Sequence, residues 1–238
     1  VTSTTAELNI TDGVTATAAE INLIDGGTAR GTTAVADGDG FLTNDGGTMR
    51  MTNVTTLATY MGTKITGGSM VYLASSGAIS NAATVAFTQF DATKYDHYEF
   101  WFQHVIPATD DVSLIAQTST NGGTAYSSTN GDYHSNGLVD KTGLVVTAES
   151  VGSDTNEFGV SGRFALLSPH TTSAYTYSMT ETVLISTDGG INAGQTNGPH
   201  QGASVRLAAE DVDAIKFLFT SGNIESGEIT MYGIANGT

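Results

Sequence analysis

From residue 70 onward, apolar and polar side chains alternate with a period of two in several segments of the chain. These segments are 97–106, 158–166, 174–185, 215–219 and 229–232. Such alternation is typical of strands in antiparallel sheets that bury one face. We therefore predict that residues 67–238 form one β domain, an antiparallel sandwich of the jelly-roll kind, although a closed barrel would produce the same pattern.

In each of these strands, the larger apolar side chains are expected to face the core. In the first strand, this expectation places Trp101 and Val105 outside. The side chains predicted to face inward in the other segments include Phe158, Val160, Phe164, Leu166, Tyr175, Tyr177, Met179, Val183, Ile185, Ile215, Phe217 and Phe219. The alternating Thr and Ser residues of segment 174–185 should then face solvent.

The first 26 residues form a 13-residue repeat, Val1–Gly13 followed by Val14–Gly26. Each copy contains Thr-x-x-Glu, the spacing of a capping box, and ends in Asp-Gly, which favours a helix stop. We predict one short helix per copy. Two short strands around Asn44–Gly47 predict a hairpin, and residues 52–61 a short helix. A glycine-containing stretch, residues 62–68, follows, so we place the boundary between a segment 1–66 and the β domain there.

The N-terminal segment has too few apolar side chains to form a core within one chain. Helices this short do not persist alone in water, and buried apolar area offsets ordering entropy only when enough of it is available. Identical copies wound about one axis would share a core. The residues predicted to form it are Leu8, Ile10, Ile21, Leu23, Leu57 and Met61. A solvated linker is the alternative.

The chain is strongly acidic, with 24 Asp and Glu against 8 Lys and Arg and a net charge of −16. Nucleic acids and anionic lipids are bound chiefly through Lys and Arg, so neither is an expected partner, and no apolar run is long enough to span a bilayer. Abundant Thr and Gly with only 3 Pro agrees with many short strands joined by tight turns.

Metal and cofactor chemistry has little support in the residue pattern, and we expect no cofactor. There is no cysteine. Asp37, Asp39 and Asp45 suggest a calcium loop, but Phe41 stands at the third ligand position and the closing Glu is missing, so turn chemistry is the preferred interpretation. Nucleophile-elbow, phosphate-loop and zinc-protease motifs are absent from the sequence, and we expect the chain not to be an enzyme.

Several segments together resemble the shaft and terminal domains of tailed-phage fibres, especially marine ones. They are the Thr-Ala-Ala-Glu-Ile-Asn-Leu-Ile-Asp-Gly repeat at 17–26, Phe-Leu-Thr-Asn-Asp-Gly-Gly-Thr-Met-Arg-Met at 41–51, Tyr-Asp-His-Tyr-Glu-Phe at 95–100 and Ser-Gly-Asn-Ile-Glu-Ser-Gly at 221–227. The resemblance implies a homotrimer located in the virion as an extracellular appendage. It further implies contact with other virion proteins and with the host surface.

We therefore expect a structural tail or side fibre whose distal β domain contacts a host surface glycan. A capsid-bound fibre or decoration protein is the alternative, and a polysaccharide depolymerase is a further one. Long polar loops at 120–134 and 187–201 are candidates for binding, because loops on a rigid sandwich often carry such residues. The candidate ligand-binding residues are Trp101, Tyr126, Asn130, Tyr133, His134, Asn192, Asn197 and Gln201. Solvated connections or contacts to a neighbouring subunit are the other interpretation of these loops, and burial against another chain is the other interpretation of Trp101.

Overall fold

The computed structural model describes residues 2, 4–6, 12–18, 21, 32–64, 70–135, 138–147, 150–154, 157–184 and 198–235. The chain divides into two units, Val1–Ile65 and Thr66–Thr238. Each unit is described by itself.

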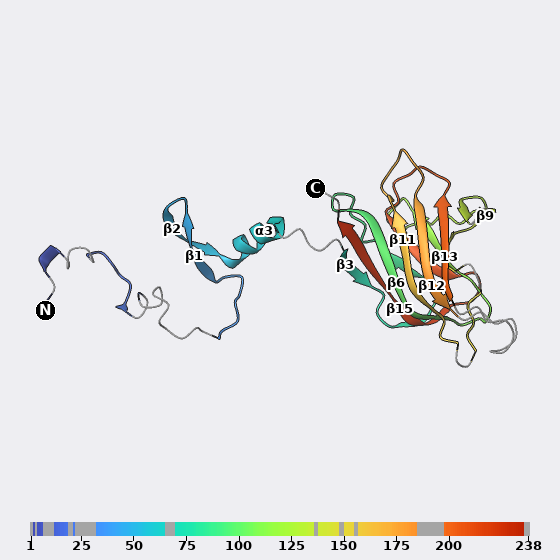
Figure 1. Ribbon diagram of the computed structural model, residues 1–238, viewed down its shortest axis with the longest axis horizontal. Coiled ribbons are helices and arrows are strands. Elements are labelled where there is room, and N and C mark those ends of the chain that lie inside the picture. Colours follow the sequence, from blue (N-terminus) through green and yellow to red (C-terminus); the bar gives the residue numbers. More distant parts are fainter. Residues whose placement is uncertain are drawn as a thin grey trace. The chain divides into compact units, whose positions relative to one another are not determined.

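The first unit contains the predicted hairpin. Strands β1 (Gly40–Asp45) and β2 (Thr48–Asn53) pair antiparallel, with Asp45 opposite Thr48 (Figure 1). The two residues between the strands, Gly46 and Gly47, both have positive φ, as a tight two-residue hairpin turn requires. The amide of Gly47 donates a hydrogen bond of 2.7 Å to Oδ1 of Asn44. The hairpin is thus confirmed.

Helix α3 (Val54–Lys64) follows the hairpin directly. Its N-terminus is capped by Asn53, whose Oδ1 accepts a 2.7 Å hydrogen bond from the amide of Thr56. The short helix expected at 52–61 is therefore present, shifted by two or three residues toward the C-terminus, because the cap falls on Asn53. None of its residues is buried.

Most of the 13-residue repeat lies outside the described residues, including both capping-box glutamates. Within the second copy, the amide of Ile21 donates to the carbonyl oxygen of Thr17 at 3.0 Å, which closes one helical turn.

The described residues of the second unit form a nine-stranded and a four-stranded antiparallel sheet, so the prediction of a mainly β fold is confirmed. The large sheet has the order β3-β15-β6-β11-β12-β13-β8-β9, and β4 also pairs with β15 (Figure 1). Its strands are β3 (Met70–Ser75), β4 (Ile79–Ala82), β6 (Tyr95–Pro107), β8 (Tyr133–Ser135), β9 (Leu138–Lys141), β11 (Val160–Leu167), β12 (Tyr177–Leu184), β13 (Gly198–Arg206) and β15 (Ile224–Ala235).

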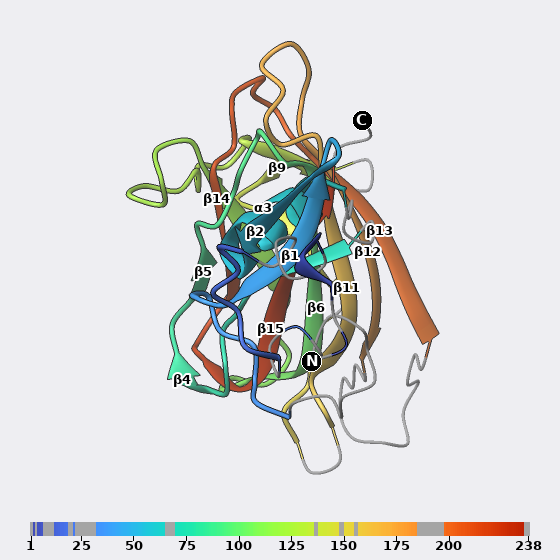
Figure 2. The ribbon, with the colours of Figure 1, turned by 90° about the vertical axis from the view of Figure 1, so that its left-hand side faces the viewer.

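The small sheet has the order β10-β7-β14-β5. Its strands are β5 (Val85–Phe87), β7 (Leu114–Ser119), β10 (Leu144–Val145) and β14 (Ala214–Phe219). In Figure 2, β5 and β14 of the small sheet lie on the left, and β6, β11, β12 and β13 of the large sheet lie on the right.

One aromatic cluster joins the two sheets. The ring of Phe217 in β14 lies 5.0 Å from Phe100, 5.2 Å from Phe102 and 5.7 Å from Phe164, measured between centroids. Phe87 of β5 packs on Phe100 at 5.5 Å. All of these side chains are buried, and edge or tilted ring packing of this kind adds to the stabilisation by burial. The core thus lies between the sheets.

The alternation in β6 changes phase at a bulge. Phe102 is buried as predicted, but Val105 is buried as well, whereas its position in the alternation predicts an outward side chain. The four residues of β6 from Phe102 to Val105 oppose only the three residues of β11 from Val160 to Gly162, and His104 has a positive φ of 45°. The extra residue reverses which face each later side chain occupies, so the prediction for Val105 is wrong.

The prediction for β12 is wrong for the whole strand. Ser178, Thr180 and Thr182 face inward and are buried, whereas Met179 and Val183 face outward and are exposed. Tyr175, Tyr177 and Phe158 are exposed too. At this side of the sheet, the inner space is lined by small hydroxyl side chains. Ser204 donates a hydrogen bond to Ser135 at 2.9 Å, whereas the Thr182 hydroxyl has no partner among the described residues. The register of β12 with its neighbours, which the alternation alone does not determine, sets which face is inside.

Candidate functional site

The outer face of the large sheet, meaning the face turned away from the aromatic core, carries the most distinctive group of side chains. Its central row is defined by register. Trp101 of β6 lies opposite Arg163 of β11, which lies opposite Glu181 of β12, which lies opposite Gln201 of β13. Residues opposite one another in antiparallel strands project to the same side, so these four side chains form one continuous line across the sheet.

Arg163 is the hydrogen-bonding centre of this row. Its Nε donates to Oε2 of Glu181 at 3.0 Å, and its Nη2 lies 3.0 Å from the same oxygen. Its Nη1 lies 3.5 Å from Oε1 of Glu99, and Nε1 of Trp101 donates to the other oxygen of Glu99 at 3.3 Å. The guanidinium therefore bridges two carboxylates from two different strands, and one of these carboxylates also orients the indole.

Two further rows follow the central one, both toward the N-terminal end of β6, and both are largely apolar. The first runs through Tyr72, Tyr232, Glu99, Ala165, Met179 and Ala203. The second runs through Met70, Ile234, His97, Leu167, Tyr177, Val205 and His134. The rings of Tyr72 and Tyr232 meet edge to face at 6.1 Å. The outer face thus combines a polar row with a largely apolar area on one side of it.

A shallow groove of about 470 Å³ lies on this face. It is lined by Glu99, Arg163, Ala165, Leu167, Met179, Thr180, Glu181, Gln201 and Gly202. Its walls offer carboxylates, a guanidinium and an amide, together with thioether and aliphatic surface. Such a groove can accept either a polar ligand with apolar patches or the side chains of another protein surface.

Three of the sequence-predicted ligand-binding residues lie on this face: Trp101 and Gln201 in the central row, and His134 four strands away from Trp101. Tyr133 does not join them, because it points into the core and is fully buried. Its hydroxyl accepts a hydrogen bond from the amide of Thr118 at 2.9 Å and donates one to the carbonyl of Ser127 at 3.0 Å. Asn192 and Asn197 lie outside the described residues.

Tyr126 and Asn130 lie apart from this face, in the loop between β7 and β8. The Nζ of Lys216 lies 4.6 Å from the centroid of the Tyr126 ring, within the range of a cation–π interaction. Burial raises the pKa of the Tyr126 phenol, and the negative charge of Asp213 adds to the increase. Asn130 is exposed. Because the buried Tyr133 hydroxyl hydrogen-bonds to Ser127 of this loop, the exposed Asn130 lies on a loop that is fixed to the core.

A chain of hydrogen bonds links Tyr98, His170 and Asp211. The Tyr98 hydroxyl lies 3.0 Å from Nε2 of His170, whose Nδ1 lies 2.8 Å from Oδ1 of Asp211. The Tyr98 oxygen also accepts the amide proton of Asp91 at 2.7 Å. Burial raises the pKa of Tyr98 to about 12. Both ring nitrogens of His170 are thus engaged, and the chain connects three segments of the fold as a structural link.

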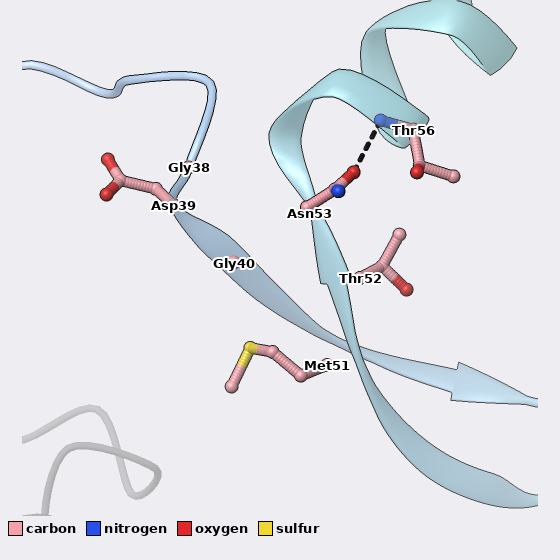
Figure 3. A pocket seen from close by; sticks show the side chains of 7 residues that line it. All are labelled: Gly38, Asp39, Gly40, Met51, Thr52, Asn53 and Thr56. Atoms are coloured by element: carbon pink, nitrogen blue, oxygen red, sulfur yellow. Dashed lines mark hydrogen bonds between the residues drawn. The ribbon is translucent and has the colours of Figure 1, made fainter.

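In the first unit, a hollow of about 630 Å³ lies beside the start of α3 (Figure 3). It is lined by Gly38, Asp39, Gly40, Met51, Thr52, Asn53 and Thr56. The Asp39 carboxylate accepts a hydrogen bond of 2.8 Å from the amide of Ala36, and Asp45 pairs with Arg50 at 2.9 Å. Within the described part of the chain, no three His, Asp or Glu side chains gather closely enough to hold a metal ion.

The residues predicted to form an oligomer core are only partly visible in the structure. Ile21 and Met61 are exposed and Leu57 is half-buried in the single chain. Leu8, Ile10 and Leu23 lie outside the described residues.

No protein-family model matches the chain, and no curated sequence matches it significantly. Among the described residues, no helix has the length and apolar character needed to cross a bilayer.

Sequence reasoning missed that Arg163 and Glu181 join Glu99 near Trp101, and that Met179 and Val183 of β12 face outward. A signal existed for part of this site, because Arg163 alternates with the buried Phe164 in β11 and must face outward. Which acids it meets depends on the register between β6, β11 and β12, and the alternation of a single strand contains no information about register.

Proposed function

We propose that this chain is a structural protein of a phage virion, a homotrimeric tail or side fibre whose β domain contacts the host surface. One observation carries the proposal. Among the described residues of the first unit, none is buried, although the hairpin and α3 are well-formed elements. Exposed apolar side chains there include Phe41, Leu42, Met49, Met51, Tyr60 and Met61.

A segment of this kind is stabilised most simply by identical neighbours. A hairpin and a short helix that bury nothing lack the apolar burial that offsets the entropy cost of ordering them. Closed rotational symmetry would let every copy cover the same side chains in the same way. The number three and the virion come from the resemblance to phage fibres, which the sequence of the hairpin and the repeat supports.

The second unit suits the distal end of such a fibre. Its two antiparallel sheets share one aromatic core, which supports a sandwich, and we propose the jelly-roll kind. We propose that the loop with Tyr126 and Asn130 contacts the host. Asn130 is exposed, and the buried Tyr133 fixes the loop through a hydrogen bond to Ser127.

Sedimentation equilibrium of the purified chain tests the oligomer. We expect a trimer at micromolar concentration and protection of the α3 amides from hydrogen exchange. A compact monomer in which the α3 amides are nevertheless protected would contradict the proposal, because the segment would then be stable without neighbours.

Labelling of intact particles tests the location. Electron microscopy with an antibody against the β domain should mark tail appendages. Label on the capsid would replace the tail fibre by the alternative of a capsid-bound fibre or decoration protein.

Adsorption tests the host contact. Replacement of Tyr126 and Asn130 by Ala should reduce adsorption of particles to host cells, whereas Tyr175→Ala serves as the control at an exposed tyrosine of the same domain outside this loop. Unchanged adsorption in the double variant would remove this loop as the contact.

The groove on the outer face gives the depolymerase alternative its one supporting feature, since Glu99 and Glu181 are two carboxylates on the same surface. Glycoside hydrolysis uses such a pair. Incubation with host polysaccharide should leave its chain length unchanged. If the wild-type protein shortened the polysaccharide and Glu99→Gln or Glu181→Gln did not, the chain would instead be a depolymerase.

A further inference from the structure

We propose that the outer face of the large sheet binds a second copy of this chain. Within the assembly, this face of one β domain then contacts the β domain of a neighbouring copy. This inference rests on the proposed function for the presence of several identical copies. It adds a second interface to that function, in the β domain and independent of the N-terminal segment.

The first argument is the orientation of β12. Tyr177, Met179 and Val183 project outward with 52%, 58% and 56% of their surface exposed, while the hydroxyl residues between them are buried. A strand in a monomer that leaves one face in water normally turns its polar side chains to that face. The opposite arrangement here leaves an exposed apolar stripe of the kind that marks an interaction surface.

The second argument is the size of the apolar surface. Tyr72 and Trp101 are 60% and 41% exposed on the same face, in rows that run directly into β12. A whole aromatic side chain covers about 150–250 Å², so each of these leaves on the order of 100 Å² uncovered. With Tyr177, Met179 and Val183, the apolar part of the face reaches on the order of 500 Å², approaching the roughly 800 Å² per partner of a stable interface.

The third argument concerns charge. The chain has a net charge of −16, so identical copies repel each other over most of their surface. At the centre of the outer face, the charges of Glu99 and Glu181 are both balanced against Arg163, at 3.5 and 3.0 Å. Two carboxylates and one guanidinium leave a charge of only −1 there, so this is a place where two copies meet with little repulsion.

The polar groups of this face favour a protein partner over a sugar. A sugar platform needs free donors and acceptors beside its aromatic rings. Here the guanidinium of Arg163 is bonded to both glutamates, and the indole N–H of Trp101 is bonded to Glu99. Polar groups that are satisfied within the chain, surrounded by aromatic and Met side chains, have the composition of an interface core.

A second copy is also the occupant present at the highest concentration. If the N-terminal segments hold copies together, the β domains are tethered and meet at an effective concentration of about millimolar. A patch of the size found here then suffices for association, even if it is too small to dimerise free domains tightly.

The single tryptophan of the chain makes the proposal testable, because Trp101 lies on the proposed interface. In the full-length assembly, we expect acrylamide to quench Trp101 severalfold less than it quenches a 41% exposed indole, with emission shifted to the blue. Met179→Arg and Val183→Arg should restore quenching, because a charge at either exposed position is tolerated in the folded chain but not in the interface. Thr120→Arg, at an exposed site after β7 of the small sheet, is the control with the same charge and should leave quenching unchanged.

Each result separates this proposal from the proposed function. A trimer whose Trp101 is protected, and is released by the two β12 variants but not by Thr120→Arg, supports both. A trimer whose Trp101 is as accessible as the exposed side chain overturns the interface and leaves the fibre standing. A monomer overturns both, and protection of Trp101 that arises only after host polysaccharide is added overturns the interface in favour of a sugar site. Circular dichroism spectra and melting temperatures matching those of the wild type ensure that the variants are folded.

Discussion

The two units of this chain reach order by different physical routes. In the first, the elements follow local rules, with Gly46 and Gly47 making the turn and Asn53 capping α3, while none of the described residues is buried. In the second, strands distant in sequence meet around Phe217, and the local rules are overridden twice, at the bulge of β6 and along β12.

The difference shows which part of the chain has a core of its own and which part does not. Local signals specify the shape of the hairpin and helix but provide little stabilising burial, which is why we propose that this unit associates with identical copies. The β domain has its own core and folds around it. Its remaining exposed apolar surface is concentrated on the outer face of the large sheet, where we place the contact between copies.

The largest effect is expected from the core of the second unit. Phe217→Ala removes the ring that joins Phe100, Phe102 and Phe164, and we expect a loss of about 3–5 kcal/mol in the free energy of unfolding. Urea unfolding followed by Trp101 fluorescence measures it. Phe41→Ala, at an exposed phenylalanine of the hairpin, should leave this transition unchanged. Equal effects of the two would abolish the contrast between the units.

A smaller loss of stability is expected at Gly227 of β15, which lies against the bulge of β6. Gly227 has φ of 119°, and a Cβ there would lie 2.5 Å from the carbonyl oxygen of His104. Gly227→Ala therefore combines backbone strain of about 1–3 kcal/mol with a clash against main chain. Gly77→Ala is the control, because Gly77 also has positive φ but nothing lies within 4 Å of its Cβ position. Thermal unfolding should separate the two variants; similar melting temperatures would mean that the bulge adjusts freely.

The cap of α3 tests the first unit. Asn53→Ala removes the acceptor for the Thr56 amide and should destabilise the helix by about 1 kcal/mol. Hydrogen exchange at α3 should accelerate accordingly, while the β domain remains protected. If exchange in both units increased, the units would be coupled more strongly than their separate contacts indicate.

The smallest effect is a pH dependence at the surface. Hydrogen bonds from Lys94 and Thr93 lower the pKa of Asp91 from 3.8 to about 2. A carboxyl with a lowered pKa stabilises the fold above its ordinary value and loses that contribution as the pH falls toward 2. The melting temperatures of wild type and Asp91→Asn should therefore converge between pH 3.8 and pH 2. Lys94→Met removes one of the hydrogen bonds that lower the pKa of Asp91, so in that background the two temperatures should converge over a narrower pH range. A constant difference across this range would remove Asp91 as the titrating group.

Much of the fold was predictable from local patterns. Asn44–Gly47 predicts the hairpin, and helical spacing after residue 52 predicts α3 to within three residues. The alternation in β6 up to Phe102 and in β11 from Val160 identifies the buried faces of those strands correctly. Of the candidate binding residues, Trp101 and Gln201 were selected from chemistry alone, and register placed them in one row.

The sequence by itself determined the properties that depend on residues a few positions away, namely tight turns, a helix cap and strand periodicity. It also determined the acidic net charge. Only the tertiary structure decided which face of β12 is inside, that the bulge at His104 turns Val105 inward, that Tyr133 is buried, and that Arg163 joins two glutamates beside Trp101. The physical reason is that a period of two defines two faces without naming the inner one. The choice is made by register and by what lies across the core, and both depend on residues far away in the chain.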